Sequence, residues 1–427
     1  MSGESPPDWA RDLVQVARAV FVVDKRIRRR DESDGWTRRI ELAVQVRDAG
    51  RWGEDARSHL DALLGALTGD EWSVDIVGGG DYHEQLEMGV AEPVAAVSLL
   101  SGGLDSACHV AAAASNGSGP MLVVGCVDRV KNVQQGIADA IRRNGGSIVL
   151  RQLDQRVRKT PGAELELSTR SRGFLYTAIA VYAAAAHRIG MVAVPENGQL
   201  AVNPPLTPAR LGALSTRSVH PWTLDRVNRL IRSIGGSVEV ENPLLGLTKG
   251  EVCARGLAAG LTPDDLYATV SCGRPTGRSL PNCGSCFPCL VRRSGLHYAL
   301  RGDRTSYSYE LVDPGDERRG TDLWAVRQWL SQALSVHDLV ADMPWPAHTP
   351  PSTVMPVLLR GREELQAMVR NLAEMREVPA PRRLGPRSSN RLPRPIDGKR
   401  ETTGGVWLAD RLTGGTTDTG LSPPAPP

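Results

Sequence analysis

Aromatic residues, long apolar runs and an excess of charge of either sign are all scarce in this sequence. Aromatics make up 4% of the chain, which weakens any stacking surface for single-stranded nucleic acid. Lys and Arg number 51 against 48 Asp and Glu, so the chain lacks the basic field of a nucleic-acid-binding protein. No stretch approaches the roughly 18 consecutive apolar residues of a membrane span. Nucleic acid and membranes are therefore not expected partners.

The first residues, Met1 to Asp8, lack a basic segment followed by an apolar one, so no signal peptide is predicted. We expect a cytoplasmic protein. The apolar share of 41% and charged share of 23% are ordinary for a folded chain, which excludes wholesale disorder. At roughly 100–200 residues per domain, 427 residues predict two or three domains.

Composition divides the chain into five regions. They are an N-terminal α+β accessory domain (1–90), an α/β domain (91–265), a cysteine-rich subdomain (266–300), a helical extension (301–376) and a tail (377–427). The tail is rich in Pro, Gly, Arg and Thr and is expected to be disordered because this composition cannot form a core.

The N-terminal region is expected to begin with a β-hairpin. Val14–Val23 and Trp36–Val46 are strand-like and are separated by a charged turn. Leucines at helical spacing in Leu60–Leu67 predict a helix, and Trp72–Val77 predicts a further strand. The glycine run Gly78–Gly80 is interpreted as a hinge.

From residue 91, nearly continuous apolar strands alternate with helices, which predicts a parallel sheet covered on both faces. The expected strands are Val94–Leu100, Met121–Val127, Ser147–Leu153, Met191–Val194 and Ser237–Val240. The expected helices are Ser106–Ser115, Val133–Arg143, Gly173–Ile189 and Leu224–Ile234.

Two amphipathic helices are expected in the extension, over Thr321–Leu334 and Glu363–Met375. In the first, Trp324 and Trp329 belong to the apolar set and are expected to be core residues.

A glycine-rich loop separates the first apolar strand from an alanine-rich helix. Its residues are Ser101, Gly102, Gly103, Leu104, Asp105 and Ser106. Glycines let backbone N–H groups turn toward one anion, and the following helix N-terminus adds partial positive charge. Because the lysine of the common G-x-x-x-x-G-K-[ST] loop is missing, this is not an ordinary kinase or GTPase loop. The alternative is a tight strand-to-helix turn with an N-cap.

Four of the seven cysteines form a cluster with the spacing C-x10-C-x2-C-x2-C. They are Cys272, Cys283, Cys286 and Cys289. Four thiolates at this spacing suit a structural, tetrahedral Zn²⁺ site, and redox chemistry of the C-x-x-C pairs is the competing interpretation. The remaining cysteines, Cys108, Cys126 and Cys253, stand singly and are expected to be buried thiols.

The loop resembles the PP-loop of the ATP pyrophosphatase superfamily, whose members transfer AMP to a substrate oxygen and release pyrophosphate. With the cysteine pattern near the end of the domain, residues 92–297 resemble the 7-cyano-7-deazaguanine synthase family, QueC. This resemblance implies ATP, Mg²⁺ and Zn²⁺ as cofactors and a PP-loop ATP-binding domain over 91–265. It also implies adenylation of 7-carboxy-7-deazaguanine followed by amide formation.

The resemblance carries roles to individual residues. The segment Ser168–Leu175 resembles the family's basic turn before its long helix, and residues 249–252 resemble its later lysine-bearing stretch. Arg170 and Lys249 are therefore predicted catalytic residues with Asp105, which either caps the loop or helps to hold Mg²⁺. Arg172 and Glu196 are predicted substrate-binding residues. For all of these, ordinary surface or loop positions are the alternative, as for His220 before Pro221.

The added regions resemble the longer QueC-like proteins of bacterial anti-phage systems of the Qat type (QatC). The pattern Asp24–Arg26, Trp36–Arg38 and Leu67–Trp72 carries this likeness. It implies protein partners from a defence operon and capture of the acyl-adenylate by a partner's amine. The family's Tyr-Pro-Asp segment is replaced here, which puts the nitrile-forming step in doubt. Alternatives are tRNA thiolation and a non-catalytic nucleotide- and zinc-binding scaffold.

Overall fold

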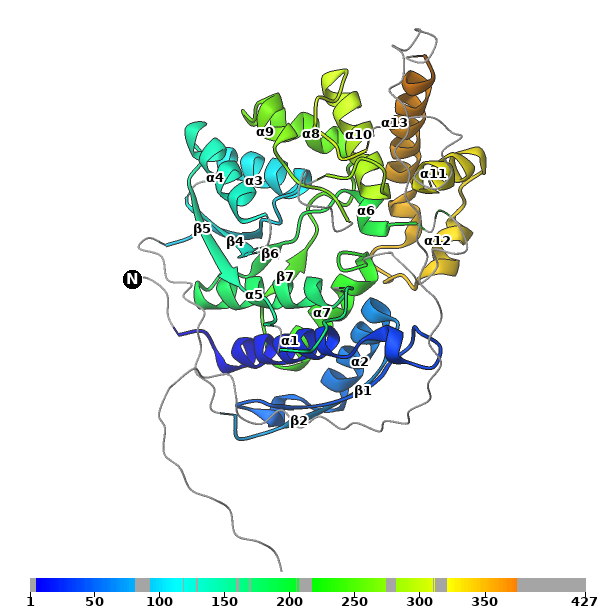
Figure 1. Ribbon diagram of the computed structural model, residues 1–427. Coiled ribbons are helices and arrows are strands. Elements are labelled where there is room, and N and C mark those ends of the chain that lie inside the picture. Colours follow the sequence, from blue (N-terminus) through cyan, green and yellow to red (C-terminus); the bar gives the residue numbers. More distant parts are fainter. Residues whose placement is uncertain are drawn as a thin grey trace, which may run out of the picture.

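The computed structural model is layered around one parallel sheet (Figure 1). It describes residues 5–80, 93–117, 119–127, 130–158, 161–168, 170–204, 206, 217–273, 282–309, 311 and 321–374. The predicted disordered tail at 377–427 lies outside the described residues. Within them, no helix combines the length and apolarity needed to cross a membrane.

The central sheet has the order β5-β4-β3-β6-β7, and all neighbouring strands are parallel. The strands are β3 (Ala96–Leu99), β4 (Met121–Val127), β5 (Ile148–Asp154), β6 (Met191–Ala193) and β7 (Glu239–Glu241). Alternate residues of β4 enter two different cores, since Met121 and Val123 lie in one cluster and Leu122 and Val124 in another. The predicted doubly covered parallel sheet is therefore confirmed.

Helices cover both faces of this sheet (Figure 1). One face carries α3 (Leu104–Asn116), α4 (Lys131–Arg143) and α8 (Lys249–Ala258). The other carries α5 (Arg172–Ala186) and α7 (Pro221–Ser233).

The N-terminal part forms two further layers beneath α5 and α7 (Figure 1). It consists of α1 (Asp8–Arg26), β1 (Arg39–Gln45), α2 (Glu54–Thr68) and β2 (Glu71–Val77). The predicted hairpin is wrong, because Val14–Val23 lies in α1 and β1 pairs in parallel with β2 through α2. Although α1 packs against both α5 and β1, its polar residues Arg11, Gln15 and Arg18 recur at helical spacing, a signal that the strand prediction missed.

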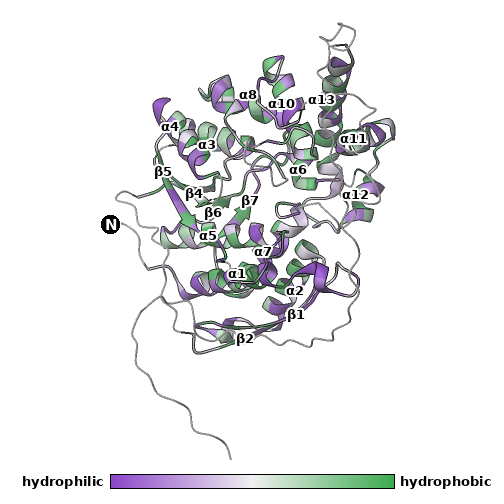
Figure 2. Ribbon diagram, viewed as in Figure 1, coloured by the Kyte–Doolittle hydropathy of each residue, from purple (hydrophilic) through white to green (hydrophobic). Residues whose placement is uncertain are grey.

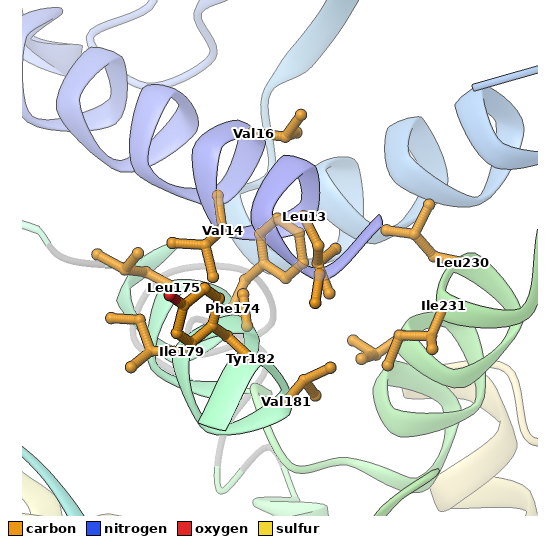
Figure 3. Packing of buried hydrophobic residues seen from close by; sticks show 14 of the residues in the cluster. Leu13, Val14, Val16, Phe174, Leu175, Ile179, Val181, Tyr182, Leu230 and Ile231 are labelled. Carbon is orange, nitrogen blue, oxygen red and sulfur yellow. The ribbon is translucent and has the colours of Figure 1, made fainter. Parts of the chain in front are cut away.

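The N-terminal part shares its hydrophobic core with the α/β domain. Leu13 and Val14 of α1 point toward Phe174 and Tyr182 of α5 (Figure 3). Apolar residues run through the layers from α5 to α1 and α2 (Figure 2). Burial of this continuous interface fixes α1 against α5.

Further helices lie above the sheet and to its right in Figure 1. They are α6 (Gly198–Val202), α9 (Pro263–Tyr267), α10 (Phe287–Leu300), α11 (Thr321–Ser331), α12 (Val336–Asp342) and α13 (Met355–Glu374). Single 3-10 turns cover Arg29–Asp31, Ala49–Arg51 and Pro351–Thr353.

The two helices predicted in the extension are present as α11 and α13. Trp329 is buried at 8% exposure, as expected, whereas Trp324 is 60% exposed, so its prediction as a core residue is wrong. In α11, Leu323, Val326 and Trp329 belong to the buried core, and Trp324 faces away from it.

Candidate active site

The order of strands reverses at β3, because β4 and β5 lie on one side of it and β6 and β7 on the other. Connections from β3 and β6 therefore leave in opposite directions, and ligands of open α/β sheets typically bind beyond the carboxyl ends of such strands. The loop 101–106 follows β3, and Glu196 and Asn197 follow β6. The fold thus brings together two segments that are far apart in the chain.

The loop is closed by its own hydroxyl groups. Ser101 Oγ lies 3.0 Å from Ser106 Oγ, which also donates to the carbonyl oxygen of Gly103 at 3.1 Å. Gly102 has φ +85°, and a Cβ there would lie 3.2 Å from Val130 Cβ. The first backbone N–H groups of α3 have no acceptor within the helix, so this end of the loop suits an anion.

Asp105 and Lys249 form a buried ion pair directly behind this loop. Lys249 Nζ lies 2.6 Å from Asp105 Oδ2, and Asn197 Nδ2 donates to the same oxygen at 2.9 Å. Exposure is 1% for Lys249 and 5% for Asp105. The three side chains come from α3, the start of α6 and the start of α8. Asp105 does not cap α3, because the N-cap of that helix has no side-chain hydrogen bond.

The pKa values of the two carboxyl groups in this cluster are shifted in opposite directions. Burial would raise the pKa of Asp105, but the Lys249 charge lowers it below its ordinary value. Burial would lower the pKa of Lys249, and the charge of Asp105 raises it instead. Burial and the neighbouring Asp105 raise the pKa of Glu196 well above its ordinary value. The cluster therefore favours the charged forms of Asp105 and Lys249 and the neutral form of Glu196.

One carboxylate oxygen of Asp105 has unused capacity as a hydrogen-bond acceptor. Among the described residues, no N–H or hydroxyl group donates to the buried Asp105 Oδ1. The carboxyl group of Glu196, whose neutral form is favoured, lies beside this carboxylate. The cluster can thus hold a charge and a transferable proton next to a phosphate-binding loop.

Local sequence explains how Lys249 is presented. Thr248 and Glu251 form a capping box, and each side chain accepts the backbone N–H of the other residue. Lys249 is the first helical residue, and its N–H donates to Gln199 Oε1 at 3.0 Å. Asn197 and Gln199 were missed from the sequence, although an Asn-Gly pair after a strand is a turn and N-cap signal.

Arg170 and Arg172 lie toward the N-terminal part. Arg170 donates to the carbonyl oxygen of Thr68 at 3.0 Å, and its guanidinium lies 4.7 Å from the centre of the Trp36 ring. Arg172 lies 5.9 Å from the ring of Tyr176. Of the predicted site residues outside the loop, the Asp105 cluster contains Lys249 and Glu196. The role predicted for the two arginines on phosphate or carboxylate groups stays a prediction.

His220 has a structural position. Its ring accepts the N–H of Trp222 as the N-cap of α7, and burial lowers its pKa to about 3. The ring is therefore neutral and packs edge-on against Trp345.

The four clustered cysteines converge on one point. Their sulfur atoms all lie within 4.8 Å of one another, with Cys272 and Cys286 at 4.0 Å and Cys283 and Cys289 at 3.8 Å. A tetrahedral zinc ion with Zn–S bonds of about 2.3 Å separates its sulfurs by about 3.8 Å. The set therefore fits a structural zinc site. In the part of the chain that the structure describes, the cysteines form no disulfide.

The cysteine cluster is connected to the glycine-rich loop. Asn282, beside Cys283, accepts the N–H of Ser271 and donates to the carbonyl oxygen of Thr269. The buried Arg292 donates to Thr269 Oγ1 at 2.6 Å. Val270, which follows Thr269 in the chain, donates its N–H to the carbonyl oxygen of Gly102 at 2.9 Å.

This arrangement of lysine and cysteines coincides with a sequence match. Residues 221–300 match the family described as queuosine biosynthesis protein QueC. The QueC match contains Lys249 and the four cysteines, whereas the loop 101–106 and Glu196 lie before it.

Curated relatives are also similar to this chain over a short region only, of 70 to 73 residues. A 7-cyano-7-deazaguanine synthase from Syntrophobacter fumaroxidans is 43% identical over 70 residues, which are 16% of this chain and 28% of the relative. One from Desulfatibacillum aliphaticivorans is 37% identical over 70 residues, again 16% and 28%. One from Alcanivorax borkumensis is 37% identical over 73 residues, 17% and 31%. The QueC similarity thus spans less than a third of the length of these relatives.

Proposed function

We propose that this chain is an ATP-dependent C–N ligase of the QueC type. It transfers AMP to the carboxylate of a 7-carboxy-7-deazaguanine-like substrate and then forms an amide. The observation that carries the proposal is the buried Asp105–Lys249 pair, with Glu196, directly behind a glycine-rich loop at the switch point of the sheet. The QueC match and the names of the relatives supply the substrate class.

The proposed reaction has two steps. A carboxylate oxygen attacks the α-phosphorus of ATP, the bond to the β-phosphate oxygen breaks, and pyrophosphate leaves. An amine then attacks the acyl carbon, AMP leaves and one proton is released. Loop residues 101–106 and the α3 N-terminus would hold the phosphates, which Mg²⁺ would accompany as a counter-charge.

The cluster behind the loop would stabilise the negative charge that develops on the phosphates during AMP transfer. Lys249 is held as a cation by Asp105, so its charge is fixed in place before ATP binds. Glu196 lies at the carboxyl end of β6, and its carbonyl oxygen would accept a hydrogen bond from an N–H group of a guanine-like edge. Arg170 and Arg172 are proposed to contact the phosphates or the substrate carboxylate.

The acceptor amine is proposed to belong to a partner protein. This part rests on the resemblance of the flanking regions to Qat-type anti-phage proteins, and we propose that the partner is encoded in the same defence operon. A protein amine would give a stable amide and end the reaction before a nitrile forms. We propose that the reaction takes place in the cytoplasm, where thiols stay reduced for Zn²⁺.

The test is nucleotide analysis of the full chain with ATP, Mg²⁺ and 7-carboxy-7-deazaguanine. We expect AMP and pyrophosphate only when the nucleobase is present, and loss of both in Lys249→Met. Lys131→Met, at an exposed lysine that begins α4, is the matched control and should turn over normally. ADP formation, or no turnover with partner proteins added, would overturn adenylation and favour the scaffold.

The thiolation alternative finds less support. Burial raises the pKa of Cys108 well above its ordinary value and that of Cys253 to about 12, so neither is a ready nucleophile. The clustered cysteines suit a metal, as described above.

A further inference from the structure

The first turn of α8, which presents Lys249, is held from outside by two other helices. The N–H groups at a helix start have no acceptor within the helix and need partners elsewhere. Here the N–H of Lys249 donates to Gln199 of α6 at 3.0 Å. The next N–H, of Gly250, donates to Glu364 Oε2 of α13 at 3.1 Å. Consecutive donors of this turn are thus capped by distant segments.

Glu364 makes a second contact at the same place. Its other carboxyl oxygen, Oε1, is hydrogen-bonded to the hydroxyl of Thr248, the N-cap residue. Glu364 is 6% exposed, so this carboxyl group is buried against the turn. One residue of α13 therefore bridges Thr248 and Gly250, on either side of Lys249.

Two glycines permit this approach of α13. A Cβ on Gly250 would lie 2.5 Å from Glu364 Oε1, and a Cβ on Gly361 would lie 2.3 Å from Gln199 Cδ. Real Cβ atoms essentially never come this close to another atom, so a larger residue at either position would displace the side chain of Glu364 or Gln199. One turn before Glu364, Arg360 donates to Glu251 at 2.7 and 3.1 Å and to the carbonyl oxygen of Gly246 at 2.9 Å.

We propose that Glu364 is a positioning residue for Lys249. It caps the first turn of α8 from the C-terminal extension and thereby fixes the lysine against Asp105. The proposal rests on the proposed function for its catalytic consequence, whereas the capping contact can be tested without it. The C-terminal extension then completes the active site of this chain.

The buried position of Glu364 gives this contact a pH dependence. Burial raises its pKa to about 7. The charged and titratable groups around it are Glu251 and Cys253 of α8, Arg360 of its own helix and Tyr298 of α10, beside Gly250. Above pH 7 both oxygens of the carboxylate accept hydrogen bonds. Below it, protonation turns one oxygen into a donor, and the cap weakens.

The experiment compares three variants of the full chain. Glu364→Ala removes the cap. Glu364→Gln can keep both contacts, with its carbonyl toward Gly250 and its amide toward Thr248, but does not titrate. Glu363→Gln, at the exposed neighbouring position, is the matched control. Hydrogen–deuterium exchange of residues 246–252 and the pH profile of AMP formation are the readouts.

In Glu364→Ala we expect faster exchange over residues 246–252 and a kcat lowered by about tenfold to hundredfold, since small displacements of a catalytic group are costly. In Glu364→Gln, which is uncharged like the protonated residue, we expect exchange and AMP formation close to those of the unmodified chain below pH 7, with no change across pH 7. Glu363→Gln should match the unmodified chain in both readouts.

Unchanged exchange in Glu364→Ala would overturn the proposal, as would a kcat that falls only with the folded fraction. If Glu364→Ala does not fold, an unaltered pH profile in Glu364→Gln overturns it instead. If the unmodified chain forms no AMP, the proposed function fails, and the exchange data still decide whether Glu364 caps α8.

Discussion

Two buried ionic clusters in this molecule differ in charge balance. In the N-terminal part, Arg38 Nη2 lies 2.7 Å from Asp24 Oδ1 and 2.5 Å from Asp70 Oδ2. Arg29 Nη2 lies 2.7 Å from Asp70 Oδ2. Each of these buried carboxylates thus has an arginine partner. This cluster also reaches α5, because Asp24 accepts the N–H of Ser171, the N-cap residue of that helix.

Behind the glycine-rich loop, two carboxyl groups face one cation. Asp105 and Lys249 are held charged, while the pKa of Glu196 rises well above its ordinary value. Balanced charge suits a structural role, because each buried ion has its partner. An extra carboxyl group with a displaced pKa is typical of a functional site. The difference predicts opposite responses to substitution.

The largest effect is expected at Asp105. Asp105→Asn removes the charge that holds Lys249, and we expect AMP formation to fall by about 10²–10³-fold. Glu196 can ionise in its place beside Lys249, so the melting temperature should fall much less than the activity. Asp139→Asn, at an exposed carboxylate of α4, is the control. Equal losses of activity and stability would make this cluster structural.

At Asp70 we expect loss of stability instead. Asp70→Asn leaves Arg29 and Arg38 short of a buried counter-charge, which costs about 3–5 kcal/mol in the free energy of unfolding. Denaturant unfolding measures this cost, and kcat per folded molecule should stay unchanged. A variant as stable as the unmodified chain would contradict the structural assignment of this cluster.

Removal of the metal tests whether the four cysteines form a functional cluster, like that of Asp105, or a structural one, like that of Asp70. Because Asn282 and Arg292 connect the cysteine segment to Gly102 through residues 269–271, we expect chelation to raise the KM for ATP several-fold. Asn282→Ala should raise this KM while metal analysis still finds one zinc per chain. If the KM for ATP is insensitive to both changes, the cysteines only stabilise the fold.

The smallest effect concerns the proton on Glu196. Its folded pKa exceeds the ordinary 4.5, so above that pH the folded chain binds more protons than the unfolded chain, and stability falls as pH rises. Glu196→Gln removes this decline, by at most about 1.4 kcal/mol per pH unit. Unfolding of both proteins between pH 5 and pH 8 measures the difference. Parallel curves would show that Glu196 is ionised in the folded chain.

The sequence predicted the α/β architecture well and the N-terminal fold poorly. Strands such as β4, Met121–Val127, are apolar throughout and bounded by turns, so their pattern is unambiguous. Val14–Val23 is also mostly apolar, but it contains Gln15 and Arg18 and forms part of a helix that is buried on two sides. Apolar composition alone does not distinguish these cases, because only the packing neighbours decide which period is needed.

What the sequence determined by itself is local chemistry. The loop from Ser101 to Ser106 and the four cysteines depend on residues close together in the chain, so their spacing already indicates an anion site and a metal site. The tertiary structure decided the partners of these groups. Asp105 and Lys249 are 144 residues apart, and only the strand order brings them together. The same holds for the contact of Glu364, in α13, with the first turn of α8 and for the contact of Arg170 with Trp36. Long-range packing selects these contacts and leaves no period in the sequence.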